Sequence, residues 1–392
     1  MTGDLGILVI NSGSSSIKFT LFQNAAVKVS GQIQGLGAEP RITLKTTGQD
    51  SRTERALSAD EGATHGAALQ ALLPMLESAA DGMWIDAVGH RVVHGGTEFS
   101  APIRIDDPIL EQLQKLVPLA PLHQPHNLAG ILAARQAFPG TVQVACFDTA
   151  FHRNHPWVND TFALPRALYD EGVRRYGFHG LSYEFICEHL RNARPRAHAG
   201  RLVVAHLGNG ASMCAIRDGQ SIGSTMGFTA LDGLPMGTRC GQVDPGVVLY
   251  LLTTKGMTAT EVSDLLYKES GLKGLSGISQ DMRTLSESSL PEAKQAIEYF
   301  VFRIRRELGA MAAVLGGLDT LVFTGGIGEN SAQVRAQVCA DQDWIGLAID
   351  PERNAATDED ISAEGARVQT LVIPTNEEEM IRRHTADLLV MA

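Results

Sequence analysis

Closely spaced cysteine pairs and long apolar runs are missing from this 392-residue sequence, and we expect no signal peptide in it. Its five cysteines lie far apart and form no CxxC pair, which argues against a disulfide framework or a zinc knuckle and favours reduced thiols. The apolar run Gly6–Ile10 is too short for the core of a signal peptide and has no basic lead-in. No stretch approaches the ~18 uninterrupted apolar residues of a membrane helix. We therefore expect a soluble, cytoplasmic protein that does not span a membrane.

Basic charge is also scarce. The sequence has 33 Lys and Arg against 44 Asp and Glu, which gives a formal net charge of −11 at pH 7. An acidic chain without a basic tract is a poor candidate for binding nucleic acid or an anionic membrane surface. We expect such a chain to hold any phosphate group with a few local cations and with backbone amides.

What the sequence does contain is typical of a globular protein with two domains. Its composition, 44% hydrophobic and 20% charged, is neither that of a disordered chain nor that of a fibrous one. Its length exceeds the ~250–300 residues at which single hydrophobic cores stop growing. Predicted helices, among them His126–Phe138 and Pro291–Leu315, alternate with short strands. This alternation predicts an α/β architecture with mixed sheets covered by helices.

The first glycine-rich segment lies at the tip of a predicted β-hairpin. Leu5–Asn11 is an apolar, β-branched run that predicts a buried strand. After Asn11–Ser16, alternating apolar and polar residues over Ile17–Leu21 predict a second strand, and Val27–Gln34 predicts a third. The P-loop pattern GxxxxGK[ST], which leads into a helix, is absent. The exposed amides and hydroxyls of such a tip are the groups that wrap a phosphate.

The same pattern recurs half a chain later. Leu202–Leu207 predicts a strand, Gly208–Gly210 a tight turn, and Ala211–Ile216 another strand. The offset of roughly 195 residues is about half the chain, which suggests an internal duplication of one domain type. Two such domains, each presenting a hairpin tip to the cleft between them, would form a clamp for a nucleotide.

A third glycine segment lies between a strand and a helix. Asp319–Thr324 predicts the strand, Gly325–Ser331 a glycine turn, and Ala332–Cys339 the helix, with Asn330 or Ser331 as its N-cap. A ligand can lie against the bare backbone of such a turn. An ordinary tight turn is the competing interpretation, because a single GGxG pattern has little specificity.

Several further segments are dense in polar residues set among glycine and proline. Together with the glycine segments, they give the sequence a close resemblance to the acetate kinase family of carboxylate kinases over residues 5–381. No single motif is specific, but the combination is. The segments that carry the resemblance are Asn11–Lys18, His90–Gly96, Pro118–His123, Cys146–His152, Arg174–Gly180, Met236–Gly241, Gly325–Ser331 and Thr375–Glu378.

The resemblance implies a duplicated, two-domain α/β fold of the sugar kinase/Hsp70/actin (ribonuclease H-like) type, with the active site in the interdomain cleft. The implied N-terminal domain, residues 1–150 with 380–392, carries the phosphate hairpin and part of an acyl pocket. The implied C-terminal domain, residues 151–379, carries the nucleotide-binding loops and a homodimer interface. The implied reaction is the reversible transfer of a phosphoryl group from ATP, with Mg²⁺ or alternatively Mn²⁺, to a short-chain carboxylate such as acetate.

The resemblance also implies a role for individual residues. The implied catalytic residues are Arg91, Asp148, His179 and Arg239. The implied substrate-binding residues are Arg91, Val93, Leu122, His123 and Phe178. The implied nucleotide contacts are Lys18, His206, Leu207, Gly208, Asn209, Gly210, Asp281, Met282, Arg283, Gly326, Ile327, Gly328, Glu329 and Asn330. The implied metal ligands are Asn11 and Glu377.

These residue types suit phosphoryl transfer to a carboxylate. A carboxylate is already ionised at neutral pH, so no general base is needed to create the nucleophile. The obstacle is the repulsion between two anions, about 4 kcal/mol for unit charges ~4 Å apart at an effective dielectric of ~20. Two arginines and a histidine donor can offset it. Asp148 is left with either an acid–base role or the orientation of an arginine or a magnesium-bound water, and we favour orientation.

Other functions remain open at this point. A sugar kinase would need a base and a polar pocket, whereas Val93, Leu122 and Phe178 are apolar. A non-enzymatic actin-like or Hsp70-like module would need only the nucleotide loops. Within the family, the alternatives are propionate and butyrate kinase. The chain departs from the family pattern beside Arg239, where Ala230 replaces the usual proline and Cys240–Gln242 replaces Ser-Gly-Asp. We expect these departures to change the shape of the acyl pocket.

Overall fold

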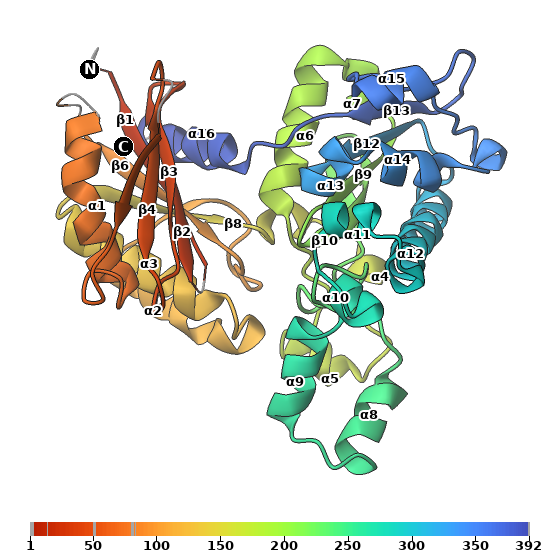
Figure 1. The fold of residues 1–392 in the computed structure, drawn as a ribbon, viewed down its shortest axis with the longest axis horizontal. Coiled ribbons are helices and arrows are strands. Elements are labelled where there is room, and N and C mark those ends of the chain that lie inside the picture. The colour runs from red at the N-terminus through yellow and green to blue at the C-terminus, as the bar shows by residue number, and fades with distance from the viewer. Residues whose placement is uncertain (1–3, 14, 50–51, 80–81, 83, 391–392) are drawn as a thin grey trace. The chain divides into compact units, whose positions relative to one another are not determined.

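The computed structural model describes residues 4–13, 15–49, 52–79, 82 and 84–390. The chain divides into two compact units, of which unit 1 is Met1–Ala150 with Asn376–Ala392 and unit 2 is Phe151–Thr375. Figure 1 shows the elements of each unit. Residues 376–379 lie in unit 1 and not in the C-terminal domain expected from the sequence, because the helix Glu377–Val390 is continuous and belongs wholly to unit 1.

Unit 1 is built on a mixed sheet with the strand order β5-β4-β3-β2-β1-β6-β8-β7. Strands β1 to β5 form an antiparallel meander, and β1, β6 and β8 run parallel. Its strands are β1 (Gly6–Ser12), β2 (Ser16–Gln23), β3 (Ala26–Gln34), β4 (Arg41–Thr46), β5 (Arg52–Ala56), β6 (Ala87–Val92), β7 (Ile103–Arg104) and β8 (Val142–Phe147). Ser14, at the tip of the predicted phosphate hairpin, lies outside the described residues.

Helices cover both faces of this sheet (Figure 1). The helices are α1 (His65–Ala79), α2 (Asp107–Lys115), α3 (Gln124–Ala137) and α16 (Glu377–Val390). Val88 of β6 belongs to the core shared with α1 and α3. Its neighbour Gly89 faces α16, since a methyl group there would lie 2.5 Å from Oγ1 of Thr385 and 2.6 Å from Cγ2 of Ile381. Successive strand residues point to opposite faces, so α16 covers the face opposite α1 and α3.

Unit 2 is built on a smaller mixed sheet with the order β11-β10-β9-β12-β13. Its strands are β9 (Arg201–Leu207), β10 (Ala211–Arg217), β11 (Gln220–Ser224), β12 (Thr320–Thr324) and β13 (Gln369–Val372). α6 packs on one face through Tyr183, Ile186 and Leu190, and α12 packs against β9 and β10. Figure 1 shows α6 and α12 on the two sides of the sheet. The helices of unit 2 are α4 (Trp157–Asp160), α5 (Arg166–Asp170), α6 (Gly180–Ala193), α7 (Pro195–Ala199), α8 (Pro245–Thr253), α9 (Ala259–Lys268), α10 (Gly271–Ser276), α11 (Met282–Glu287), α12 (Pro291–Leu315), α13 (Gly325–Asn330), α14 (Ala332–Cys339) and α15 (Pro351–Ala356).

The two sheets repeat one topology. In unit 1 the order β3-β2-β1-β6-β8 consists of three antiparallel strands followed by two parallel additions, and in unit 2 the order β11-β10-β9-β12-β13 does the same. The two predicted hairpins are β1–β2 and β9–β10, which hold equivalent places in this order. The predicted duplication is therefore confirmed.

The predicted glycine turn after β12 is wrong. Gly325–Asn330 is a short helix, α13, that follows the strand directly. Gly325 makes the change of direction at φ 77°, which favours glycine, and its N–H donates to the Glu329 carboxylate at 2.8 Å. Of the two N-caps considered for the next helix, Ser331 is the one used, since its hydroxyl accepts the N–H of Val334 at 3.3 Å. Within the described residues, no helix combines the length and apolarity needed to cross a membrane.

Candidate functional site

Arg91 and Asp148 of unit 1 form a bidentate ion pair. The Arg91 Nε lies 2.9 Å from Oδ1 of Asp148, and Nη2 lies 2.7 Å from Oδ2. Oε2 of Glu377 lies 3.8 Å from the same Nε. Asp148 is buried, whereas 20% of the Arg91 side chain is exposed. The structure thus brings together three of the predicted site residues that are far apart in the sequence.

The topology of the sheet explains this meeting. Arg91 lies near the end of β6 and is paired in register with Cys146 of β8, its parallel neighbour. Asp148 directly follows β8, and its N–H donates to the carbonyl of Val92 at 3.1 Å. Glu377 is the first residue of α16, which packs on β1, β6 and β8. Ligand groups gather at the carboxyl ends of parallel strands in α/β sheets.

This cluster holds the Arg91 guanidinium in its charged form. Burial alone would lower the pKa of Arg91, but the charges of Asp148 and Glu377 and the hydrogen bonds to Asp148 raise it above its ordinary value. The bonds to Asp148 use one edge of the planar guanidinium, and the edge that carries Nη1 faces away from Asp148. Arg91 can therefore bind a second anion without releasing the first.

Asn11 and Lys18 lie on the face of the sheet that α16 covers. The two residues are direct cross-strand partners in β1 and β2, so their side chains share one face. Thr20 is two residues along β2 on that face, and its hydroxyl lies 3.4 Å from Oε2 of Glu378. Burial raises the pKa of Glu378 and the charge of Glu377 adds to this, while Lys18 lowers it. Asn11, Lys18 and the acidic first turn of α16 thus border one region of unit 1.

The predicted acyl-pocket residues of unit 1 lie beyond the end of β6 and before α3. Val93 is buried, and Leu122 and His123 are partly exposed. Sequence analysis missed Asn127 of α3, which is buried. Its Oδ1 accepts the N–H of Val93 at 3.0 Å, and its Nδ2 donates to the carbonyl of Ser12 at 3.0 Å. A polar residue on the buried face of the predicted helix is the signal that could have indicated this link.

Hydroxyl groups hold His179 in unit 2. His179 precedes α6 in a left-handed conformation, at φ 58°. Its Nδ1 lies 2.8 Å from Oγ of Ser212, which is also hydrogen-bonded to the hydroxyl of Tyr183. The imidazole stacks on that of His206, with ring centroids 4.3 Å apart and planes 25° apart. Nδ1 of His206 in turn lies 2.9 Å from Oγ of Ser182.

Gly210 marks the place where His179 and Arg239 approach each other. A methyl group on Gly210 would lie 3.0 Å from Nε2 of His179 and 3.9 Å from Nη1 of Arg239. Because glycine has no such group, both nitrogens face one small space above the turn between β9 and β10. Two potential donors to a single anionic group are thus adjacent within unit 2.

The loop that carries Arg239 is fixed mainly by backbone contacts. Nη1 of Arg239 donates to the carbonyl of Ala230 at 3.1 Å and lies 3.6 Å from Sδ of Met236. The N–H of Gly237 donates to the carbonyl of Asn209 at 3.3 Å, which joins this loop to the turn after β9. Gln242, which departs from the family pattern, anchors the end of this loop to α12, since its amide oxygen accepts from Nη2 of Arg303 at 2.9 Å.

Gly271, the first residue of α10, allows this helix to pack against the loop that carries Arg239. The N–H of Leu272 donates to the carbonyl of Met236 at 2.8 Å, and that of Ser270 to the carbonyl of Thr238 at 3.0 Å. Gly271 has φ 62°, and a methyl group on it would overlap the Met236 carbonyl oxygen. Only glycine meets both conditions without displacing the loop.

The predicted nucleotide contacts of unit 2 come partly from adjoining segments. The Cβ position of Gly208 lies 3.8 Å from the backbone nitrogen of Gly326, so the start of α13 adjoins the turn after β9. A methyl group on Gly326 would meet nothing within 4 Å, so a ligand can approach this backbone. Two of the predicted nucleotide-binding residues accept hydrogen bonds from the protein's own backbone. The Asp281 carboxylate accepts the N–H of Thr284 at 2.9 Å as N-cap of α11, and the Glu329 carboxylate accepts the N–H of Gly325. Those two carboxylates serve the fold.

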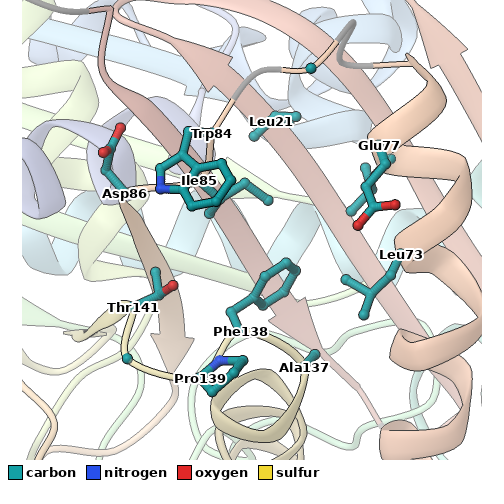
Figure 2. Close-up of a pocket in the computed structure, with 13 residues that line it drawn as sticks. Leu21, Leu73, Glu77, Trp84, Ile85, Asp86, Ala137, Phe138, Pro139 and Thr141 are labelled. Carbon is teal, nitrogen blue, oxygen red and sulfur yellow. The ribbon is translucent and has the colours of Figure 1, made fainter.

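A cavity elsewhere in unit 1 contains none of the predicted site residues. It has a volume of about 720 Å³ and lies between β2, α1, the end of α3 and the segment that leads to β6. Figure 2 shows the aromatic rings of Trp84 and Phe138 among its lining side chains. The site residues of unit 1 lie instead at the ends of β1, β6 and β8.

Comparisons with known proteins identify the family of the chain. The acetokinase family matches residues 6–383 of the chain. The chain belongs to the acetokinase family. An acetate kinase of this family from Methylocella silvestris is 57% identical over 98% of both chains, and one from Nitrobacter hamburgensis is 49% identical over 98% of this chain and 96% of that one.

Solved structures of the acetokinase type share the fold. The crystal structure of an acetate kinase from Porphyromonas gingivalis has a TM-score of 0.89 at 36% identity, covering 98% of this chain and all of that one. A propionate kinase from Francisella tularensis has a TM-score of 0.92, also at 36% identity, covering 98% of this chain and 99% of that one. Both results agree with the duplicated fold described above.

Proposed function

We infer that this chain is an ATP-dependent acetate kinase, which catalyses the reversible reaction of ATP and acetate to ADP and acetyl phosphate. The observation that carries this inference is 57% identity to an acetate kinase over 98% of both chains. Two features support it: the bidentate Arg91–Asp148 pair of unit 1 and, within unit 2, the neighbouring donors His179 and Arg239. A nucleotide-binding module without catalysis has no use for them.

The reaction needs positioning and charge stabilisation more than proton transfer. Acetate is ionised at neutral pH, so its oxygen attacks the γ-phosphorus in line with the leaving ADP oxygen without a base. Arg91 binds anionic oxygens through the edge of its guanidinium that faces away from Asp148. Arg239 and His179 donate to the phosphoryl oxygens as their charge increases in the transition state.

Asp148 acts by orienting Arg91. Both of its carboxylate oxygens accept from the guanidinium, at 2.9 and 2.7 Å, which fixes the plane of the fork. A carboxylate engaged in this way is a poor general base. The acid–base alternative considered for Asp148 is therefore less consistent with these contacts than orientation.

Asn11 and Glu377 would hold Mg²⁺, with Mn²⁺ as the alternative. Hard carboxylate and amide oxygens are suitable ligands, and Mg²⁺ takes the remainder from water and phosphate. Among the residues that the structure describes, no group of three or more His, Cys, Asp or Glu could hold a metal alone. When bound, the ion neutralises phosphate charge. Glu377 also lies 3.8 Å from Arg91, so it faces the same anions.

The remaining predicted residues divide between the two substrates. We assign Val93, Leu122 and Phe178 to the methyl end of the acyl group, with His123 beside it. We assign the adenine nucleotide to Lys18 and to the predicted segments of unit 2. The backbone of residues 208–210 and 326–328 is accessible to a nucleotide because four of these residues are glycines, which have no side chains.

Propionate is the alternative acyl substrate. The similarity to the Francisella propionate kinase, with its TM-score of 0.92, favours it as a second candidate. Ala230 in place of the family's usual proline points the same way, since it removes part of a pocket wall. Butyrate kinase is a further member of the same series.

A cytoplasmic homodimer is the form we propose. The five cysteines, all among the described residues, form no disulfide with one another, which suits a reducing compartment. Unit 2 exposes Val247, Leu249 and Tyr250 on α8, and Phe302 on α12, which are candidates for covering by a second copy of the chain. Light scattering should then give twice the chain mass of 42.0 kDa. The mass of a single chain at micromolar concentration would contradict the dimer.

A hydroxylamine trap for acyl phosphate tests the enzymatic function. We expect ATP-dependent hydroxamate formation, with kcat/KM falling from acetate to propionate and further to butyrate. A higher value for propionate would make the protein a propionate kinase. Nucleotide binding without hydroxamate from formate, acetate, propionate or butyrate would leave only the non-enzymatic actin-like or Hsp70-like alternative.

Asp148→Asn tests the orienting role. The amide keeps one acceptor for Arg91, so we expect turnover about tenfold lower, equivalent to one charge-assisted hydrogen bond, and no new pH dependence. Complete loss of turnover with intact MgATP binding would support acid–base catalysis. Asp160→Asn is the matched control, because Asp160 is also buried and pairs with Arg153 at 3.0 Å, and neither residue is a predicted site residue. It should lower stability and leave kcat unchanged.

A further inference from the structure

Three buried groups beside the candidate phosphoryl site form a chain of hydrogen bonds. Oγ of Ser212 lies 2.8 Å from Nδ1 of His179 and is also hydrogen-bonded to the hydroxyl of Tyr183. Tyr183 and Ser212 are 0% exposed and His179 is 9% exposed. Ser212 comes from β10 and Tyr183 from the first turn of α6, one turn after His179. Two secondary-structure elements therefore define the surroundings of one imidazole nitrogen.

The acid–base order of these groups sets the direction of the chain. Each hydroxyl has one proton to donate, and a neutral imidazole has one N–H and one bare nitrogen. A phenol, with an ordinary pKa near 10, is a stronger acid than an alkyl alcohol, and a bare imidazole nitrogen is the strongest base of the three groups. The Tyr183 hydroxyl therefore donates to Oγ of Ser212, and the Ser212 hydroxyl donates to Nδ1 of His179.

The opposite nitrogen of the ring then carries the proton. Nε2 of His179 lies 3.0 Å from the Cβ position of Gly210, in the space that it shares with Nη1 of Arg239. Which imidazole nitrogen is protonated is decided by the hydrogen bond that the other one makes. With Nδ1 accepting from Ser212, the Nε2–H is aimed at the place where phosphoryl oxygens must lie if Arg239 is to reach them.

We propose that Tyr183 and Ser212 are positioning residues that hold His179 as the neutral tautomer with its proton on Nε2. The effect of this tautomer on catalysis rests on the proposed kinase function, whereas the presence of the tautomer does not. Stacking on His206, with ring centroids 4.3 Å apart, disfavours a charge on both rings at once, because two charged imidazoles at that distance would repel each other. His206 has its own hydroxyl partner in Ser182, so it does not compete for Ser212.

Nitrogen-15 NMR of the full-length protein with ring-labelled histidine tests the tautomer directly, without substrate. We expect Nδ1 of His179 to have the shift of a bare nitrogen and Nε2 that of a protonated one, with the signals assigned by their absence in His179→Gln. A protonated Nδ1 would overturn the proposal. This result is independent of whether the protein phosphorylates acetate.

Kinetics of hydroxyl-deleting variants test the consequence. We expect Tyr183→Phe to lower kcat about fivefold, equivalent to one neutral hydrogen bond, and to shift the Nδ1 resonance. The KM values for acetate and MgATP should stay within about twofold, as for a group that acts only in the transition state. Tyr176→Phe is the matched control, since Tyr176 is also buried in unit 2 and donates to the carbonyl of Gly172 at 2.6 Å. The control should leave kcat and the His179 signals unchanged.

A double-mutant cycle separates positioning from general loosening of the fold. Ser212→Ala should lower kcat more than Tyr183→Phe, and adding Tyr183→Phe to Ser212→Ala should have no further effect, because Tyr183 acts through Ser212. Additive losses, or an unchanged Nδ1 signal in Tyr183→Phe, would overturn the proposal. If Ser212→Ala does not fold, Tyr183→Phe with its NMR signature still decides. If the wild type makes no acetyl phosphate while the predicted tautomer is observed, the kinase function fails and the positioning stands.

Discussion

Arg91 in unit 1 is held by charge, whereas Arg239 in unit 2 is held to its own loop by a backbone carbonyl and a thioether. Asp148 grips Arg91 at 2.9 and 2.7 Å with Glu377 nearby, and Arg239 donates to the carbonyl of Ala230 at 3.1 Å. The position of Arg91 thus depends on particular carboxylates. The positions of Arg239 and His179 depend on the path of the backbone and on the hydroxyl of Ser212.

The difference suggests a division of labour. A guanidinium beside two carboxylates is fixed in direction and has part of its charge compensated, which suits the orientation of a substrate anion. An arginine on a backbone-supported loop moves with that loop, which suits a group that follows the transferring phosphoryl. Mutations should therefore act through charge in unit 1 and through backbone geometry in unit 2.

The largest effects are expected from removing the arginines themselves. Arg91→Ala and Arg239→Ala should each lower kcat by ~10²–10⁴-fold, the scale of losing one preorganised donor in an active site. Only Arg91→Ala should also lower stability markedly, by up to about 3 kcal/mol, because it leaves the buried Asp148 carboxylate without its guanidinium. Arg91→Lys should not restore turnover, since an ammonium group cannot form the bidentate pair. Steady-state hydroxamate assays and thermal melts check both statements, and equal melting temperatures for the two alanine variants would contradict the comparison.

A smaller loss of kcat is expected when a side chain on α10 displaces the loop that carries Arg239. A methyl group at Gly271 would overlap the Met236 carbonyl at a φ of 62°, so Gly271→Ala should shift the loop and lower kcat at least tenfold. Gly277→Ala is the matched control: Gly277 has φ 64° with nothing within 4 Å of its Cβ position. The control carries only the left-handed strain of about 1 kcal/mol. Equal turnover in the two variants would show that α10 does not position Arg239.

Long or strongly patterned elements could be predicted from the sequence, and side-chain contacts could not. The strands β1, β2, β9 and β10 follow from apolar runs and alternation, and the duplication follows from their spacing. The helix Gly325–Asn330 was missed because six residues are too few to show a helical period. Asn127 and Ser212 were missed because their roles depend on partners 115 and 33 residues away in the chain. The sequence resemblance identified the charged residues, but it could not show that Asp148 forms a fork with Arg91.

Acid should weaken both units, with a modest effect per group. Burial lowers the pKa of His90 in unit 1 to about 4, and that of His152 and His155 in unit 2 to about 3 and about 4. Unfolded histidine, at its ordinary value of 6.5, then binds more protons than the folded form. The contribution of these histidines to the free energy of unfolding should therefore be flat above pH 7 and fall below about 6.5, by up to about 1.4 kcal/mol per pH unit and per group.

Urea denaturation at pH 7, 6 and 5 checks this dependence in each unit. His90→Gln should flatten the curve by the contribution of unit 1, since glutamine can hydrogen-bond but does not titrate. His155→Gln should remove one of the two histidine contributions of unit 2, and that of His152 should remain. If the slope of either variant between pH 6 and 5 equals that of the wild type, the corresponding histidine is not held neutral by burial.

The smallest effect concerns the acyl group and the position where the loop departs from the family. In the proposed site, Ala230 lacks the ring that the usual proline would add to the wall of the acyl pocket, and we expect a longer acyl chain to gain room there. Each methylene buried there should contribute roughly 0.8 kcal/mol, or about fourfold in relative kcat/KM. Ala230→Pro should therefore shift the propionate-to-acetate ratio of kcat/KM about fourfold towards acetate.

The contact with Arg239 makes this prediction interpretable. Proline keeps its carbonyl, so the Ala230→Pro variant can still accept the hydrogen bond of 3.1 Å from Nη1. If proline instead distorts the backbone, Arg239 is displaced and kcat falls for acetate and propionate alike, which leaves the ratio unchanged. If the variant keeps both the propionate-to-acetate ratio and the kcat of the wild type, Phe228 or Leu234 already fills the space. The pocket is then no wider than in relatives with proline. The ratio and kcat together therefore separate a wider pocket, a displaced arginine and a repacked wall.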